Sequence, residues 1–301
     1  MNNPAPSHGK RSWADLALLL VAVVWGSAFV AQRTAMEGVG PFTFNATRFA
    51  LGGLVSLLIY VVGIKFFPRP LLSRPGGLRG GLLLGLLLFG GASAQQIGLV
   101  RTSAGQAGFI TGLYVVLVPL LLAMVWRERV GWPAWAGGGL AVTGLFLLSV
   151  QAGFQLSPGD GWVLVSAFLW AFHVIAVGRV APGRDPFLLA TVQYFVCALL
   201  SLPAALALER WEWSGMLLAG PAILYAGAIS AGLSYTTQIV AQPHTTPARA
   251  AIILSGEAVF ATLFGWLLLG EGLTARQLLG CGLMLAGMLL AQILPQRHRE
   301  H

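Results

Sequence analysis

Few side chains in this sequence combine chemical reactivity with a place inside its long apolar runs, and His173 and Glu257 are two of them. An ionisable group at bilayer depth is costly, so each is a candidate for function until a structural role explains it. A histidine and a glutamate inside one helical bundle could carry protons, or each could be a hydrogen-bonded side chain that fixes packing. We weigh the two roles equally for His173. For Glu257 we favour a place in a cavity, because a carboxylate facing lipid would be untenable.

Arg48 lies in the second apolar run, where its guanidinium could bind a carboxylate or another anion through two parallel hydrogen bonds. The alternative is an arginine tied to carbonyl groups near the outer interface. We favour this structural role and keep the functional one open.

Three glutamines in apolar runs, Gln95, Gln96 and Gln238, offer uncharged hydrogen-bonding groups. An amide can bind an amino or a carboxyl group without creating a fixed buried charge. Hydrogen bonding between helices is an equally good explanation of such residues. We expect Gln95 and Gln238 to contact a ligand, because they recur at matching places in the two halves described below.

Aromatic residues occur near the same helix faces as these polar groups: Trp25, Phe29, Tyr114, Trp170 and Tyr235. Small-molecule sites are usually apolar pockets with a few convergent polar groups, and aromatic walls suit bulky hydrophobic ligands. An aromatic stripe at helical spacing can also be ordinary packing. We include all five in a predicted substrate-binding cavity.

The sequence lacks the residue patterns of an enzyme. It has no paired carboxylates, no H-E-x-x-H metal spacing and no plausible Ser/His/Asp set, so we expect no catalytic residues, no metal ligands and no cofactor. Cys197 and Cys281 lie inside apolar runs and are interpreted as packing residues. A membrane-embedded enzyme acting on lipid is therefore disfavoured, and a channel would lack a recognisable filter.

The elements that position these residues follow from composition. Of 301 residues, 56% are hydrophobic and only 9% are charged, too few to cover a water-soluble surface. A bilayer core requires about 20 apolar residues per helix, and no run alternates with the period of a barrel strand. We predict an all-α integral membrane protein with ten transmembrane helices. They span residues 13–32, 41–62, 78–100, 105–126, 133–151, 161–179, 187–208, 216–238, 248–270 and 274–294.

Positive charges indicate orientation rather than nucleic-acid binding, because no basic stripe is interleaved with aromatic residues. With the N-terminus inside, the cytoplasmic segments hold thirteen Lys and Arg residues, and the outer loops hold four. The positive-inside rule then places both termini in the cytoplasm. Lys10 and Arg11 before the first run could also mark a cleaved signal peptide, but the repeat requires this helix.

An internal repeat organises the ten spans. Each half contains five spans, an odd number, so the second half must enter the membrane from the opposite face. We predict two inverted five-helix repeats, residues 1–152 and 153–301, around a central cavity. The matching residues are Asp15/Asp160, Trp25/Trp170 and Pro41/Pro186 at an offset of 145, and Gln95/Gln238, Thr102/Thr245, Glu128/Glu271, Gly137/Gly280 and Gly144/Gly287 at an offset of 143.

The repeat carries a family resemblance over nearly the whole chain. The supporting motifs are Trp25-Gly26-Ser27-Ala28-Phe29, Pro41 followed by Arg48, Pro119, Arg127-Glu128-Arg129 and Gly270-Glu271-Gly272. In this order they resemble the drug/metabolite transporter superfamily in its ten-helix, EamA-type form. The general character is similar to YddG-type aromatic amino-acid exporters of bacteria, although no substrate signature supports that closer resemblance.

The resemblance implies a secondary transporter, not an enzyme, in the bacterial inner membrane. We expect export of small metabolites, with aromatic or hydrophobic amino acids favoured, by alternating access through a cavity between the first, third, fourth, sixth, eighth and ninth spans. The alternative is export of another class, such as nucleoside-like or amphipathic compounds. Protons are a further candidate partner. The lipid bilayer is the expected setting, and nucleic acid is not an expected partner.

Glycine and proline residues bear on helix movement. Gly77, Gly81 and Gly85 recur every four residues, which predicts close packing of the third span against a neighbour. Pro119 removes a backbone hydrogen bond and predicts a kink that could act as a hinge. Its repeat mate is Thr262, so we expect the two halves to bend differently.

Overall fold

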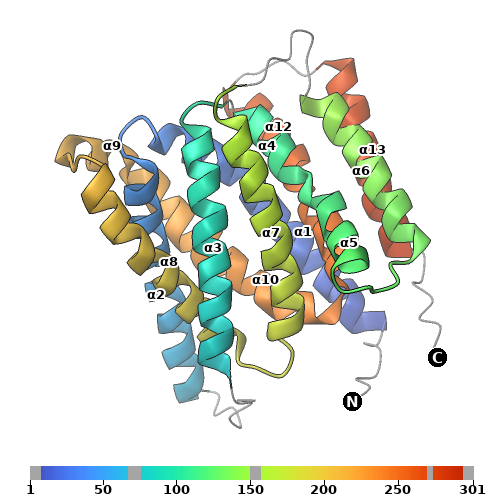
Figure 1. The fold of residues 1–301 in the computed structure, drawn as a ribbon, viewed down its shortest axis with the longest axis horizontal. Coiled ribbons are helices and arrows are strands. Elements are labelled where there is room, and N and C mark those ends of the chain that lie inside the picture. The colour runs from blue at the N-terminus through green and yellow to red at the C-terminus, as the bar shows by residue number, and fades with distance from the viewer. Residues whose placement is uncertain (1–7, 67–75, 103, 150–156, 270–273, 294–301) are drawn as a thin grey trace.

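The computed structural model describes residues 8–66, 76–102, 104–149, 157–269 and 274–293, and these parts form a bundle of helices (Figure 1). The predicted boundary between residues 152 and 153 lies outside the described residues. In chain order the elements are α1 (His8–Ala35), α2 (Pro41–Phe66), α3 (Gly77–Leu99), α4 (Ala104–Gly112), α5 (Tyr114–Met124), α6 (Trp132–Ser149), α7 (Asp160–Val180), α8 (Pro186–Leu208), α9 (Trp213–Leu224), the π-helix η1 (Tyr225–Tyr235), α10 (Thr236–Ala241), the 3₁₀ helix η2 (Gln242–His244), α11 (Pro247–Leu254), α12 (Glu257–Leu269) and α13 (Ala275–Ile293).

These elements form the ten predicted spans. Eight stretches are long and apolar enough to cross a membrane, and the shorter apolar helices Trp132–Leu148 and Ala275–Ala291 supply the fifth and tenth spans. The fourth span consists of α4 and α5, the eighth of α9, η1 and α10, and the ninth of α11 and α12. We call the face where α1 begins and α13 ends the terminal face, and the opposite face the far face (Figure 1).

Close glycine contacts between α6 and α13 reveal how the two halves are related. A Cβ added at Gly144 would lie 2.5 Å from the carbonyl oxygen of Gly280, and one added at Gly280 would lie 2.5 Å from that of Gly144. Gly137 and Gly287 approach each other in the same reciprocal way. Residue numbers rise along α6 as they fall along α13, so these two helices, which are equivalent in the repeat, run antiparallel. The predicted inverted repeat is therefore confirmed at this pair.

Other packing obeys the same two-fold relation. Phe49 of α2 stacks on its repeat mate Tyr194 of α8, with ring centroids 6.3 Å apart. In the repeat, α1 corresponds to α7, α3 to the eighth span, and α5 to α12. Helix α3 packs on α7, and the eighth span likewise packs on α1. Helix α5 packs on α7, and α12 likewise packs on α1. Equivalent helices of the two halves thus make equivalent contacts, as expected for the pseudo-two-fold relation of an inverted repeat.

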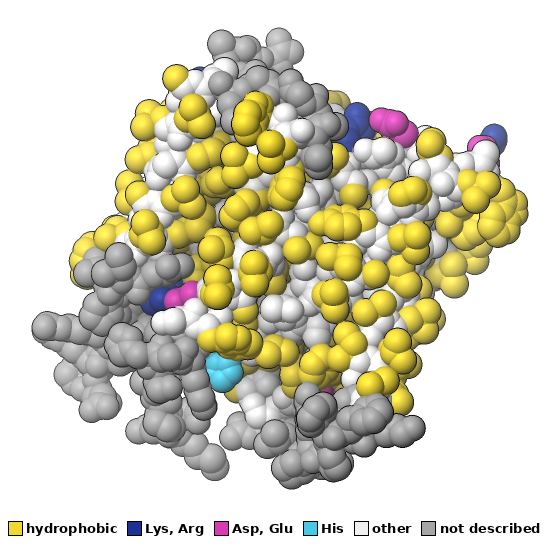
Figure 2. Space-filling view, turned by 180° about the vertical axis from the view of Figure 1, so that it is seen from behind, with side chains coloured by type: hydrophobic (Ala, Val, Ile, Leu, Met, Phe, Trp, Pro, Cys, Tyr) yellow, Lys and Arg dark blue, Asp and Glu magenta, His cyan; other side chains and the backbone are white. Residues whose placement is uncertain are grey.

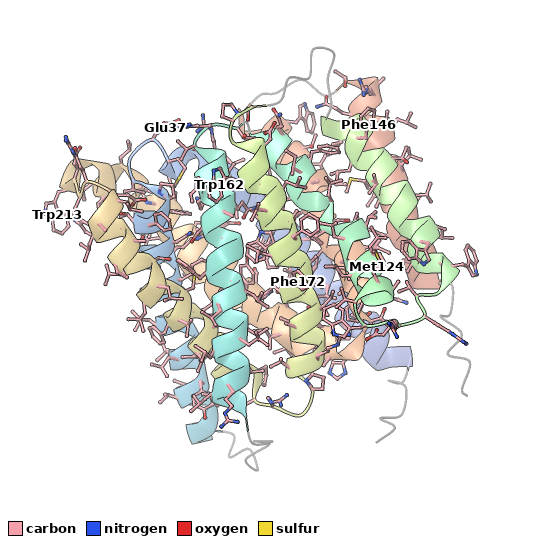
Figure 3. All side chains as sticks on the ribbon, viewed as in Figure 1. Glu37, Met124, Phe146, Trp162, Phe172 and Trp213 are labelled. Carbon is pink, nitrogen blue, oxygen red and sulfur yellow. The ribbon has the colours of Figure 1, made fainter. Side chains whose placement is uncertain are left out.

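The outer surface is suited to lipid. Figure 2 shows hydrophobic side chains over most of one broad face, with charged groups toward its edges. Leu206, Trp213 and Leu217 are 69%, 74% and 78% exposed. Figure 3 shows Trp213 and Phe146 at opposite sides of the molecule, and Glu37 and Trp162 at the far face. Large apolar side chains can remain exposed here because hydrocarbon, and not water, surrounds them.

The glycines of α3 allow the close packing that their spacing predicts. A Cβ at Gly81 would lie 2.6 Å from Cβ of Val192, and one at Gly85 would lie 2.6 Å from Cβ of Val196, both on α8. These two contacts bring the backbone of α3 against valine side chains of its neighbour.

The two interruptions in the helices do not coincide with Pro119, whose role as a hinge stays a prediction. The α-helical hydrogen-bond pattern of the fourth span is interrupted at the single residue Leu113, between α4 and α5, which keeps near-helical dihedral angles (φ −59°, ψ −16°), and Pro119 lies inside α5. The ninth span breaks at Ser255 and Gly256, the equivalent positions of the other half, although it has no proline there. The two halves therefore break alike, and the proline is not required for the break.

Candidate functional site

One cavity lies at the centre of the bundle, with about 500 Å³ of space unoccupied by protein atoms when its open side is included. It is lined by parts of the six predicted spans and also by α2. All nine residues predicted to bind substrate line it, together with five others. The full lining is Trp25, Phe29, Gln32, Arg48, Gln95, Thr111, Tyr114, Trp170, His173, Val174, Ser230, Tyr235, Gln238 and Glu257.

Tyr114 and Glu257 meet on the pseudo-two-fold axis. They are repeat mates, and each is the first residue of the half-helix that follows a break. The Tyr114 hydroxyl donates a hydrogen bond of 3.4 Å to Oε1 of Glu257. The breaks therefore bring these side chains to the cavity, and the carboxylate benefits from lying at the N-terminal end of α12.

Three aromatic rings form one wall. The ring of Tyr235 lies 4.4 Å from that of Trp25 and 6.0 Å from that of Trp170, measured between centroids. The indole Nε1 of Trp25 donates to the carbonyl oxygen of Ser230 at 3.3 Å. Trp25 and Trp170 are repeat mates, whereas Ser230 and Tyr235 come from the π-helix, a wider helix often found at functional sites.

The two predicted glutamines have different environments in the same cavity. Nε2 of Gln95 donates to Oγ1 of Thr111 at 3.1 Å. Nε2 of Gln238 donates to Oε1 of Gln242 at 3.0 Å, while the Gln238 Oε1 atom is buried without a hydrogen-bond partner among the described residues. Gln96, by contrast, does not line the cavity, and its Nε2 lies 3.7 Å from Sδ of Met36.

His173 lines the cavity and is also held by a neighbouring helix. It lines the cavity, yet its Nε2 is 3.1 Å from Oε1 of Gln193, which lies outside the lining. Its ring also packs edge-on against Trp170, with centroids 5.8 Å apart. The histidine is thus held in place by neighbours while one side faces the cavity.

Arg48 differs from its favoured structural interpretation. Its Nε donates to Oδ1 of Asn45 at 3.1 Å and its Nη1 to Oε1 of Gln32 at 3.0 Å, so its hydrogen-bond partners among the described residues are side-chain amides. The guanidinium carbon lies 4.8 Å and 4.6 Å from the ring centroids of Phe44 and Phe49. The side chain is 5% exposed and lines the cavity.

The charges of Arg48 and Glu257 face the same cavity without pairing. Among the described residues, neither side chain forms an ion pair with the other, and each has only neutral hydrogen-bond partners. A buried charge without an opposite partner is costly, so this arrangement is expected where a ligand supplies the missing charge.

Sequence reasoning missed four lining residues. Val174 has the mate Phe29 and could have been found from the repeat offset. Gln32 is polar within an apolar run and could have been weighed with the other glutamines. Thr111 and Ser230 are small hydroxyl residues, whose types carry no such signal.

The lining groups are of the kinds that bind a small molecule. In the described parts of the chain, no three His, Cys, Asp or Glu side chains gather closely enough to hold a metal ion. What the cavity offers is an aromatic wall, two unpaired charges and several amide groups.

Comparison with known proteins identifies the family of this chain. The chain matches the EamA-like transporter family twice, over residues 12–150 and 157–292. It is 31% identical to an uncharacterized transporter of Archaeoglobus fulgidus, covering 94% of this chain and 87% of the relative. It is 25% identical to a probable terminal-alkyne amino-acid exporter of Streptantibioticus cattleyicolor, covering 93% and 94%. It is also 25% identical to an S-adenosylmethionine/S-adenosylhomocysteine transporter of Chlamydia trachomatis, covering 91% and 88%. The chain therefore belongs to the EamA-like transporter family and is a multi-pass membrane transporter.

Proposed function

We propose that this protein exports amino acids with aromatic or hydrophobic side chains by alternating access through the central cavity. The observation that carries the proposal is the presence of Arg48 and Glu257, neither of which forms an ion pair among the described residues, in one cavity with an aromatic wall. A zwitterionic amino acid carries one ammonium and one carboxylate, which together complement both charges.

Each part of such a substrate has a matching group. Glu257 and Tyr114 would receive the ammonium, and Arg48 would bind the carboxylate. The rings of Trp25, Trp170 and Tyr235 would contact the side chain, since aromatic surfaces favour apolar or aromatic ligands.

Two relatives support an amino-acid substrate through their names. One is a probable exporter of a terminal-alkyne amino acid. The other transports S-adenosylmethionine and S-adenosylhomocysteine, both of which carry an α-amino-acid group. The second name also favours the alternative class, nucleoside-like compounds, because an aromatic wall would accept an adenine ring as well.

Protons are the further partner that we propose. Glu257 lies in the cavity with one hydrogen bond from Tyr114, and the other titratable or charged groups lining the cavity are Arg48, His173 and Tyr235. An ammonium and a proton would compete for the same carboxylate, which would couple export to proton entry.

The proposed setting is the bacterial inner membrane with both termini in the cytoplasm. This orientation rests on the distribution of Lys and Arg residues between the loops. It makes the terminal face cytoplasmic and the far face periplasmic.

Transport by purified protein in proteoliposomes tests the proposal. Uptake of a panel of labelled amino acids and nucleosides is measured with and without a pH gradient. We expect saturable flux of aromatic or hydrophobic amino acids, and loss of that flux in Trp170→Ala and Tyr114→Ala. Flux of nucleosides alone would refute the amino-acid proposal, flux that never saturates would indicate a pore, and flux indifferent to the pH gradient would refute proton coupling.

A further inference from the structure

A buried ion pair connects α1 and α11 near the terminal face. Nε of Arg249 donates to Oδ1 of Asp15 at 3.0 Å, and Nη2 donates to Oδ2 of the same carboxylate. Asp15 is 8% and Arg249 4% exposed. We call this pair the terminal latch. A two-point contact of this kind between a guanidinium and a carboxylate is among the stronger polar contacts in proteins.

A second buried carboxylate connects α7 and α4 near the far face. Oδ2 of Asp160 accepts hydrogen bonds from Nε2 of Gln106 at 2.6 Å and the backbone N–H of Ser157 at 2.7 Å. Oδ1 accepts from Oγ1 of Thr102 at 2.9 Å. We call this cluster the far latch. Its donors are all neutral.

The two latches are the same feature in the two repeats. Asp160 follows Asp15 by 145 residues, and Arg249 follows Gln106 by 143, which are the offsets of the repeat. Inversion of the repeat places one copy at each face. The copies differ mainly in the partner of the aspartate, an arginine at the terminal face and a glutamine at the far face.

Each latch holds the outer half of a broken span. The far latch holds α4, which ends at the break at Leu113, and the terminal latch holds α11, which ends at the break at Ser255 and Gly256. The cavity residues Tyr114 and Glu257 begin the helices beyond these breaks. An outer half-helix could therefore swing about its break while the cavity residue stays in place.

We infer that the two latches are gates of unequal strength, and that the exchange of Arg249 for Gln106 between the repeats sets which face of the transporter opens more readily. This inference rests on the alternating access in the proposed function but not on the identity of the substrate. The ionic terminal latch holds its face closed more firmly, because separating the pair leaves a charge without its partner in a buried site. The neutral far latch opens more often.

Cysteine labelling from each side of the membrane tests the inference. In a background with Cys197→Ala and Cys281→Ala, Ser230→Cys places one thiol in the cavity. A charged, membrane-impermeant thiol reagent is applied to vesicles of each orientation. In the reference protein, which carries only these three substitutions, the thiol at position 230 should be labelled faster from the far face than from the terminal face. Arg249→Gln should raise labelling from the terminal face by about tenfold or more, because breaking a buried pair is a large perturbation.

The exchange of the two partners gives the sharper result. Gln106→Arg should slow labelling from the far face, and the double variant Gln106→Arg, Arg249→Gln should invert the preference between faces. The double variant Asp15→Asn, Arg249→Gln removes both charges of the terminal latch and leaves no unpaired charge. It should therefore open the terminal face even where Arg249→Gln alone folds poorly. Thermal unfolding of each variant identifies misfolded protein.

The control is an exposed ion pair. Arg179→Gln removes a partner of Glu128 at 2.5 Å, but both side chains are well exposed, 35% and 49%, and such pairs contribute little. This variant should label like the reference. The inference is overturned if the reference labels equally from both faces, if the folded double-neutral variant labels like the reference, or if the partner exchange leaves the preference unchanged.

Discussion

Replacing the two cavity charges one at a time should separate the two ends of the substrate. Glu257→Gln keeps the size and the hydrogen-bonding capacity of the side chain but removes its negative charge. Arg48→Gln removes the positive charge and reproduces the residue found at the equivalent position of the other repeat, Gln193. If Glu257 binds the ammonium and Arg48 the carboxylate, each variant should lose recognition of one group only.

The size of each effect follows from the contacts. A hydrogen bond to a charged group contributes about 1.5–3 kcal/mol, which corresponds to about 10- to 150-fold in affinity. Glu257 has one long hydrogen bond of 3.4 Å within the protein, so the amide should cost the fold little. Arg48 has two hydrogen bonds and lies over two rings, so its replacement should lower the unfolding temperature more.

The assay is inhibition of labelled phenylalanine flux in proteoliposomes by three unlabelled compounds. Phenylalanine has both groups, phenethylamine lacks the carboxylate and 3-phenylpropionate lacks the ammonium. In Glu257→Gln, inhibition by phenylalanine and phenethylamine should weaken by about 10-fold or more, while that by 3-phenylpropionate should not change. In Arg48→Gln, inhibition by phenylalanine and 3-phenylpropionate should weaken, while that by phenethylamine should not change.

The pattern across compounds decides the outcome. If both variants weaken all three inhibitors equally, the charges act through the fold and do not bind opposite ends of the substrate. Glu128→Gln is the matched control, because that carboxylate is exposed, pairs with Arg179 and lies outside the cavity lining. It should leave all three inhibition constants unchanged.

Two further predictions concern the helices. Pro119→Ala should keep the transport rate and leave the fourth span broken, because the ninth span breaks at the equivalent place without a proline. Loss of transport in a folded variant would instead support Pro119 as the hinge. Gly81→Ala should destabilise the protein by about 1–3 kcal/mol, because its Cβ would lie 2.6 Å from that of Val192. The control Gly161→Ala, with no atom within 4 Å of its Cβ, should be neutral or stabilising in the same thermal unfolding measurement, and equal effects of the two substitutions would contradict the packing argument.

The fold was largely predictable because lipid imposes simple rules on sequence. A span must be long and apolar, and an odd number of spans per repeat forces inversion. The residues that line the cavity were predictable for a related reason. Polar residues such as Gln95, Gln238 and Glu257 are expensive within apolar runs, so they occur where a cavity accepts them. Inversion then brings repeat mates, such as Trp25 and Trp170, to the same central place.

The helix breaks were not predictable because their cause is not local. Pro119 suggested a kink from chemistry alone, yet the chain breaks at Leu113 and at Ser255 and Gly256. Gly112 precedes the first break and Gly256 lies within the second, and both leave no room for a side chain: a Cβ at Gly112 would lie 2.7 Å from Leu145, and one at Gly256 would lie 2.7 Å from Met288. Such contacts depend on which helices become neighbours, which a single sequence does not state. The ionic partner of Asp15 was missed for the same reason, since Arg249 lies 234 residues away.

Differences between the two repeats carry the chemistry of the site. A cavity with identical halves would present the same groups to both ends of a substrate and could not distinguish an ammonium from a carboxylate. In this chain the mates of the two charged residues are neutral: Tyr114 corresponds to Glu257, and Gln193 to Arg48. Each repeat therefore contributes one charge of opposite sign to a cavity in which two lining pairs, Trp25/Trp170 and Gln95/Gln238, are identical in the two repeats. The unmatched pairs Tyr114/Glu257 and Arg48/Gln193 thus give the cavity one group of each sign, which is the arrangement that the proposed zwitterionic substrate requires.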